Sequence, residues 1–160
     1  MTSSPGKGGV IIERPDLTVV DTREMPWDDF PGFPGSKVKV LSRDAQGDPE
    51  VFLLWFPPLA MWPEGARLRP RHYHKTIRES YYVLNGIHPQ WEYDDRQDQG
   101  GELLRLREGF YVDRHPGSVH RSDPSGSDAG CLMLTWRTGP GNWGHEPEAD
   151  NETIDVEDDV

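Results

Sequence analysis

The stretch 65–86, GARLRPRHYHKTIRESYYVLNG, contains most of the candidate site and the pattern from which the fold can be inferred. It places His72 and His74 two residues apart, and Glu79 follows five residues after His74. Residues i and i+2 of a strand point to the same face, so both imidazoles would enter one space if they lie on a strand. A third histidine, His120, lies in a second turn-rich stretch, GFYVDRHPGSVH. Three imidazoles and one carboxylate suit a transition or borderline metal ion, so we expect these four side chains to share one.

Glycines flank these candidate ligands at fixed spacings. The first run is Gly65-x6-His72-x-His74-x4-Glu79-x6-Gly86, and the second is Gly109-x7-Gly117-x2-His120. The runs resemble the two motifs of the cupins, with one extra residue after the first glycine and with Pro116 moved directly before Gly117. The resemblance covers roughly residues 37–138. It implies a small antiparallel β-barrel whose metal ligands are His72, His74, Glu79 and His120.

The composition also favours an all-β domain. Of the 160 residues, 17 are Gly and 15 are Pro, whereas only 34% are hydrophobic. Such a chain suits short strands joined by many turns and argues against long helices. Closing the strands into a barrel would remove the edges along which sheets aggregate. We therefore expect one all-β domain, and the resemblance to the cupins implies that it is a cupin-type double-stranded β-helix, or jelly-roll, barrel.

Three segments are expected within this chain. Residues 1–36 should form a flexible N-terminal arm and loop with short strands, 37–140 the barrel, and 141–160 an acidic, disordered tail. The last sixteen residues contain eight acids and no Lys or Arg, and without them the net charge of −11 would be −3. The barrel is thus only mildly acidic, and neither part favours nucleic acid or anionic membranes. In cupins, arms before the barrel often pair with a second subunit, which implies a homodimer.

Local patterns predict individual strands and turns. The run VFLLWF at 51–56 is apolar on both faces, so we expect the barrel interior to cover one face and a sheet or partner the other. The pair Asn85-Gly86 is a strong signal for a two-residue hairpin turn, because both positions accept positive φ. Three aromatic residues of the loop 26–35 are expected to pack over a barrel edge.

The single cysteine, Cys131, cannot form an internal disulfide, which fits a reducing compartment. It lies in the apolar run CLMLTW, where the alternatives are a small buried strand residue and a reactive thiol. The sequence contains no run of 18 apolar residues and no basic-then-apolar N-terminus. We therefore expect no membrane span, no secretion signal and a cytoplasmic location.

Strand alternation identifies candidate pocket residues. If Glu79 points inward, Tyr81 and Val83 should point inward as well and line the substrate site. Tyr81 could then donate a hydrogen bond to a substrate oxygen as a catalytic group, or it could be an ordinary core tyrosine. On the last strand, Arg137 would hold an anionic substrate if its face is interior, and it would be a surface charge if that face is exterior.

The remaining histidines are less informative. His115 has two alternatives, a fifth imidazole near the metal or a surface loop position beside Pro116 and Gly117. His88 and His145 have no other candidate groups around them, and the sequence assigns them no role.

Four protein ligands would leave one or two coordination positions open, as a catalytic metal requires. Mixed N/O ligation permits one divalent ion among Fe(II), Mn(II), Ni(II), Cu(II) and Zn(II). A looser resemblance to cupins of the acetylacetone-dioxygenase and ChrR type favours Fe(II), and with it a dioxygenase that takes O2 and a small oxygenated or dicarbonyl compound. That resemblance rests on the strand at 37–41 and the Pro-Gly before it. The alternatives are a metal-dependent isomerase, epimerase or lyase, and a non-catalytic small-molecule-binding cupin.

Overall fold

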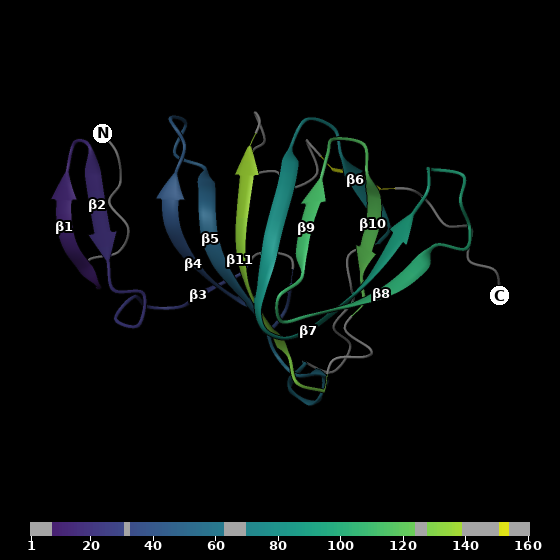
Figure 1. Cartoon of the computed structure of the whole chain (residues 1–160), viewed down its shortest axis with the longest axis horizontal. Helices are drawn as coiled ribbons and strands as arrows, with labels where there is room; N and C mark the ends of the chain where they lie inside the picture. The colour runs from purple at the N-terminus through teal and green to yellow at the C-terminus, as the bar shows by residue number, and fades with distance from the viewer. Residues whose placement is uncertain (1–7, 31–32, 63–69, 124–127, 139–150, 154–160) are drawn as a thin grey trace.

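The computed structural model describes residues 8–30, 33–62, 70–123, 128–138 and 151–153, and this part of the chain is almost entirely β (Figure 1). Its elements are β1 (Val10–Arg14), β2 (Leu17–Val20), β3 (Asp28–Asp29), β4 (Lys37–Arg43), β5 (Pro49–Phe56), the 3-10 turn η1 (Leu59–Met61), β6 (His72–His74), β7 (Arg78–Tyr93), β8 (Glu102–Arg107), β9 (Tyr111–Arg114), β10 (Val119–Ser122), β11 (Cys131–Thr138) and β12 (Asn151–Thr153). The expected all-β class is confirmed. Among the described residues, no helix has the length and hydropathy needed to cross a bilayer.

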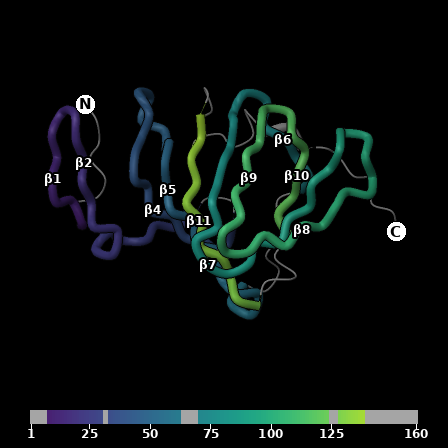
Figure 2. The backbone as a smooth tube through the Cα atoms, in the orientation of Figure 1, coloured from purple at the N-terminus to yellow at the C-terminus, as the bar shows by residue number. Residues whose placement is uncertain are grey.

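Strand β7 connects the two halves of the molecule. Its first half pairs with β9 and β11, and its second half pairs with β8 and β10. The large antiparallel sheet runs in the order β12-β6-β10-β7-β11-β5-β4-β3. Figure 1 shows β4, β5, β11 and the start of β7 side by side, with β6, β8 and β10 on the other side of the molecule. The backbone tube in Figure 2 shows β7 bending from one half into the other. A single long strand therefore holds both halves of the barrel in register.

The hairpin predicted at Asn85-Gly86 is wrong, because β7 continues through both residues. Leu132 of β11 pairs with Asn85, but Met133 pairs with Val83, so Leu84 is an extra residue and forms a bulge. Gly86 has φ +84, and a Cβ atom there would lie 2.2 Å from the backbone oxygen of Gly130. The glycine is thus required for a bulge and a close backbone approach within a strand, not for a chain reversal.

The hydrophobic core fills the space between the two halves. It is formed by inward side chains of β4, β5, β7, β8 and β11, closed by two aromatic residues from the preceding loop. Those two, Phe30 and Phe33, are stacked with ring centroids 5.1 Å apart, and Phe33 meets Phe56 of β5 edge to face at 5.4 Å. The third aromatic residue of that loop, Trp27, remains 41% exposed beneath the Lys39 ammonium. Two of the three predicted loop aromatics therefore belong to the core itself.

Both terminal segments contain strands. In the predicted arm, β1 and β2 form a separate two-stranded sheet that lies beyond β4 at one end of the molecule (Figure 1). Within the tail that we expected to be disordered, β12 pairs antiparallel with β6, with Asn151 opposite His74 and Thr153 opposite His72. Residues 1–7, 139–150 and 154–160, on which the rest of these expectations fall, lie outside the described part.

Candidate metal centre

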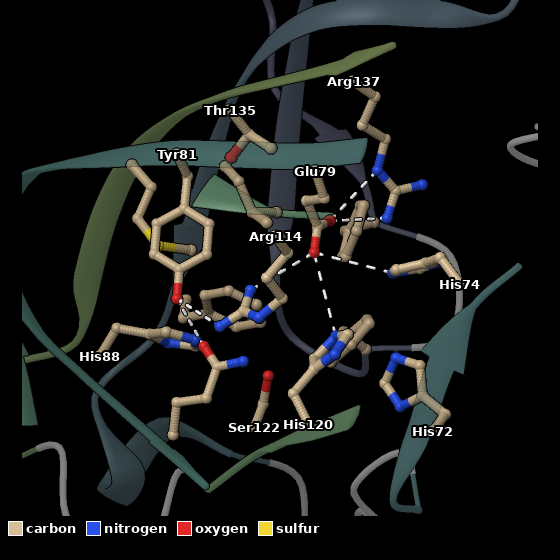
Figure 3. Close-up of a pocket in the computed structure, with 16 residues that line it drawn as sticks. His72, His74, Glu79, Tyr81, His88, Arg114, His120, Ser122, Thr135 and Arg137 are labelled. Atoms are coloured by element: carbon tan, nitrogen blue, oxygen red, sulfur yellow. Dashed lines mark hydrogen bonds and ion pairs between the residues drawn. The ribbon is translucent and has the colours of Figure 1, made fainter. Parts of the chain in front are cut away.

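Three buried histidines meet at one end of the interior (Figure 3). His72 and His74 project from the same face of β6, and His120 on β10 is the direct cross-strand partner of His72. One ring nitrogen from each residue lies within 4.8 Å of the others, and all three side chains are buried. The sequence spacing predicts this convergence, and the antiparallel pairing of β6 with β10 produces it.

The tautomers of two of these imidazoles suit metal binding. The Nδ1 atom of His72 lies 2.8 Å from the carbonyl oxygen of Pro70, and the Nδ1 atom of His120 lies 3.1 Å from that of Ser118. A carbonyl oxygen only accepts hydrogen bonds, so both Nδ1 atoms must carry the proton and donate. Each Nε2 atom then keeps its lone pair for a ligand, as in metal sites where a second partner orients the imidazole.

Burial affects the protonation of one of these imidazoles, that of His120. It lowers the pKa of His120 well below its usual value, and the neighbouring Arg114 and His72 lower that pKa further. A neutral imidazole is the form that binds a metal, because the protonated ring has no free lone pair. The donor set therefore fits a divalent transition ion, and these three histidines could hold one.

Glu79 lies beside the triad. Its Oε2 atom is 3.7 Å from Nε2 of His74 and 3.9 Å from Nε2 of His120. Its Oε1 atom accepts hydrogen bonds from Nε and Nη2 of Arg137, at 3.1 and 2.7 Å. Burial alone would raise the pKa of Glu79, but the neighbouring Arg137, His74 and Arg114 outweigh it and hold that pKa well below the usual value. One ionised oxygen therefore faces the histidines while the other is held by a cation.

Arg137 is on the interior side of the barrel. It pairs with Glu79 across β11 and β7, and its side chain is only 10% exposed. Of the two alternatives that the sequence leaves open, the structure selects the interior face. The guanidinium lines the cavity next to the proposed metal ligands, where it positions Glu79. Its role toward an anionic substrate stays a prediction.

Tyr81 points inward, as strand alternation predicts, but its hydroxyl is already engaged. It donates a 2.5 Å hydrogen bond to Oε1 of Gln90 and accepts a 3.1 Å bond from Nη2 of Arg114. Burial raises the pKa of Tyr81 far above its usual value. Its predicted donation to a substrate would require the bond to Gln90 to break. Val83 is completely buried in the hydrophobic core and is not on the cavity wall, which removes the basis for its predicted contact with substrate.

The sequence analysis missed several cavity residues. Arg114 of β9 lies beside the proposed metal ligands, and its Nη1 atom is 3.5 Å from Oε2 of Glu79. The same guanidinium forms a close ion pair with Glu92. His88 and Gln90 line the cavity on the second half of β7, and Thr135 lines it from β11. His88 and Gln90 have even numbers, whereas Glu79 and Tyr81 have odd ones, because the bulge at Leu84 reverses which residues face inward. Recognising Gly86 as a bulge signal would have found them.

Two further expectations are settled by burial. His115 is a surface residue with a 68% exposed side chain, 3.7 Å from a carboxylate oxygen of Asp113. Cys131 is buried in β11, and burial raises the pKa of its thiol to about 12. His115 is therefore not a fifth metal ligand, and Cys131 is a structural residue with an unreactive thiol.

No protein-family model matches this sequence, and no curated protein does. Solved structures resemble the fold. The ethanolamine utilization protein Q from Salmonella typhimurium LT2 is 14% identical over 89% of this chain and 100% of its own, with a TM-score of 0.56. A predicted oxalate decarboxylase from Thermotoga maritima is 16% identical over 76% and 99% of the two chains, with a TM-score of 0.53.

A third similar structure is much longer. The capsular polysaccharide assembling protein CapF from Staphylococcus aureus is 15% identical over 82% of this chain, with a TM-score of 0.55. The match covers 32% of CapF, so this chain spans about a third of that protein. At such low identity these likenesses define the fold alone. The fold is the cupin-type jelly roll, which confirms the predicted barrel class.

Proposed function

We propose that this protein is a metal-dependent cupin enzyme, and that it acts as a non-haem Fe(II)-type dioxygenase on a small oxygenated or dicarbonyl compound. His72, His74 and His120 would hold the metal, with Glu79 as fourth ligand. The observation that carries the proposal is the convergence of three buried imidazoles beside one carboxylate whose pKa is held well below its usual value. A bound ion would supply redox or Lewis-acid chemistry at its open positions.

The cavity limits the size and charge of the substrate. Its volume is about 50 Å³, which is room for only a few water molecules at roughly 10–15 Å³ each. Its walls include the guanidinium groups of Arg114 and Arg137 but, among the described residues, one carboxylate, that of Glu79. With a dication bound by the three histidines, the part of the cavity beside them would attract an anionic or oxygen-rich group. The apolar part of the wall is formed by Phe30, Phe33, Leu54, Phe56 and Met133.

A lyase is the second candidate, and two observations favour it. The cationic side chains at the metal end suit a small carboxylate, and two of the similar structures are described as oxalate decarboxylases. A decarboxylating or isomerising enzyme would use the same ligands and the same cavity. The two candidates differ in whether oxygen is consumed.

Oxygen consumption separates these functions. Protein loaded anaerobically with Fe(II) or Mn(II) would be mixed with 2,4-pentanedione, oxalate, catechol or cysteine while dissolved O2 and products are measured. We expect Fe(II)-dependent O2 uptake with a dicarbonyl compound, and its loss in the double variant His72→Ala/His120→Ala. Product without O2 uptake would replace the dioxygenase by a lyase or isomerase. Binding without turnover of any compound would contradict both and leave a small-molecule-binding protein.

A further inference from the structure

The cavity has a second polar end that the metal centre does not use. Its wall also includes the buried side chains of Thr135, His88 and Gln90 and the rings of Phe33 and Phe56. Figure 3 shows Thr135 near the backbone end of the Tyr81 side chain and His88 near its hydroxyl. None of Thr135, His88 and Gln90 belongs to the histidine triad, and none is hydrogen-bonded to Glu79 in any described interaction. The cavity therefore contains a metal-binding end and, away from it, three polar side chains without a formal charge.

Thr135 carries the strongest indication of a missing partner. The residue is only 2% exposed, and its Oγ1 atom has no hydrogen-bond partner in the described part of the chain. A buried hydroxyl without a partner is costly, and such groups in native proteins usually bind an ordered water or a ligand. Thr135 faces inward between Met133 and Arg137, which also line the cavity from β11. Its hydroxyl is thus available to a molecule inside the cavity.

His88 makes this end neutral. Its ring stacks on Phe56 with centroids 5.2 Å apart and meets Tyr81 edge to face at 5.9 Å. Burial, with a smaller contribution from Arg114, lowers the pKa of His88 to about 4, so the imidazole is uncharged near neutral pH. Gln90 is held in place by the hydroxyl of Tyr81. The groups at this end can exchange hydrogen bonds, but they offer no charge to an anion.

Strand geometry fixes the distance between the two ends. Thr135 pairs with Tyr81, and Arg137 pairs with Glu79, so the two pairs are one two-residue step apart. Such a step along a strand is about 6.6 Å. A ligand that reaches from the metal end to Thr135 must therefore place two oxygen-bearing groups about four or five atoms apart. This length also suits the small cavity volume.

We propose that the hydroxyl of Thr135 is a neutral binding subsite for an uncharged oxygen, a hydroxyl or carbonyl group, at the far end of a three- or four-carbon oxo acid. The acid group would occupy the end formed by the histidines, Glu79 and Arg137, so the proposal rests on the proposed function. The hydroxyl of Thr135 is the specificity-determining group, because it lines the cavity and is a buried polar atom with no hydrogen-bond partner among the described residues.

The test compares two ligands of nearly equal shape. 3-Hydroxypyruvate carries a hydroxyl where 2-oxobutanoate carries a methyl group, and both have the same acid end. Their affinities for Mn(II)-loaded protein under argon would be measured by isothermal titration calorimetry. We expect wild-type protein to prefer hydroxypyruvate by about tenfold, the effect of one good hydrogen bond. Thr135→Val should abolish this preference without weakening 2-oxobutanoate, and Thr135→Ser should retain it.

Controls separate this inference from the proposed function. Metal content is measured in every variant, and Thr138→Val, at the exposed end of the same strand, is the matched control. If Thr135→Val does not fold, Thr135→Ala replaces it. Equal affinities in wild type, no binding of either compound, or an undiminished preference in Thr135→Val would overturn the subsite. If wild-type protein binds no metal, the proposed function fails, and the same comparison on metal-free protein still decides the subsite.

Discussion

At the scale of single residues, Arg114 connects the two ends of the cavity. It approaches Glu79 at the metal end, donates to the hydroxyl of Tyr81, and forms an ion pair with Glu92. Burial lowers the pKa of this guanidinium, but the oxygens of Tyr81, Glu92 and Glu79 more than offset it and raise that pKa above its usual range. Arg114 is therefore a permanently charged positioning residue.

Replacing Arg114 should be costly. Arg114→Met keeps much of the side-chain volume but leaves Glu79 and Glu92 without this cation, so we expect the free energy of unfolding to fall by about 3 kcal/mol or more. Urea denaturation monitored by circular dichroism measures this. The control Arg107→Met removes an exposed arginine of β8 and should change stability by about 0.5 kcal/mol at most. Equal effects in the two variants would show that the ion pairs around Arg114 contribute nothing.

Individual site residues differ in how well the sequence predicts them. His72, His74 and His120 could be predicted because their spacing and the neighbouring glycines define where two strands pass each other. Arg114 could not, because its partners are 22 and 35 residues away along the chain. The hydroxyl of Tyr81 was expected to be available, and only the structure shows the two neighbours that occupy it.

At the scale of elements, the bulge in β7 determines which residues face the cavity. Before it, odd-numbered residues such as Tyr81 point inward, and after it the even-numbered His88 and Gln90 do. The pair Asn85-Gly86 correctly indicates a positive φ at Gly86. It predicted a hairpin turn, whereas the structure has a bulge within β7. Local preference cannot distinguish these outcomes, because the deciding contact is with Gly130, 44 residues further along the chain.

Gly86→Ala tests this element directly. The substitution combines an unfavourable φ of +84 with a Cβ atom placed 2.2 Å from a backbone oxygen. Gly47→Ala is the matched control, because its φ is +91 but nothing lies within 4 Å of the added atom. The control should lose about 1–2 kcal/mol from its backbone conformation alone. We expect thermal melting to show a clearly larger loss for Gly86→Ala. Similar melting temperatures would contradict the close approach of β7 and residue 130.

At the scale of the whole molecule, one outer surface of the sheet is apolar. Leu53 and Trp55 of β5, Leu134 and Trp136 of β11, and Tyr111 of β9 all lie on the outer side, and each remains partly or largely exposed. Tyr111 and Trp136 stack with ring centroids 5.7 Å apart. The two-faced apolar pattern at 51–56 predicts such a surface, and the described part of the chain leaves it uncovered. We propose that a second copy covers it, which gives the homodimer expected from the sequence.

Size-exclusion chromatography with light scattering measures this association. We expect wild-type protein to have twice the chain mass of 18.2 kDa. Leu134→Glu introduces a charge at the centre of the apolar surface and should shift the protein to a monomer, because an unpaired charge is costly in an interface. Arg107→Glu, exposed on β8, is the control and should leave the mass unchanged. A monomeric wild type, or a dimer that survives Leu134→Glu, would contradict this use of the surface.

The central claim is that His72, His74 and His120 bind one metal ion inside the barrel. Inductively coupled plasma mass spectrometry of protein made without a metal-affinity tag tests it most directly, with His115→Ala as the control at an exposed histidine. We predict about one transition-metal ion per chain in wild type and in the control, and almost none in the folded double variant His72→Ala/His120→Ala. Wild-type protein that remains metal-free after incubation with Fe(II), Mn(II) and Zn(II), or a double variant that keeps its metal, would contradict it.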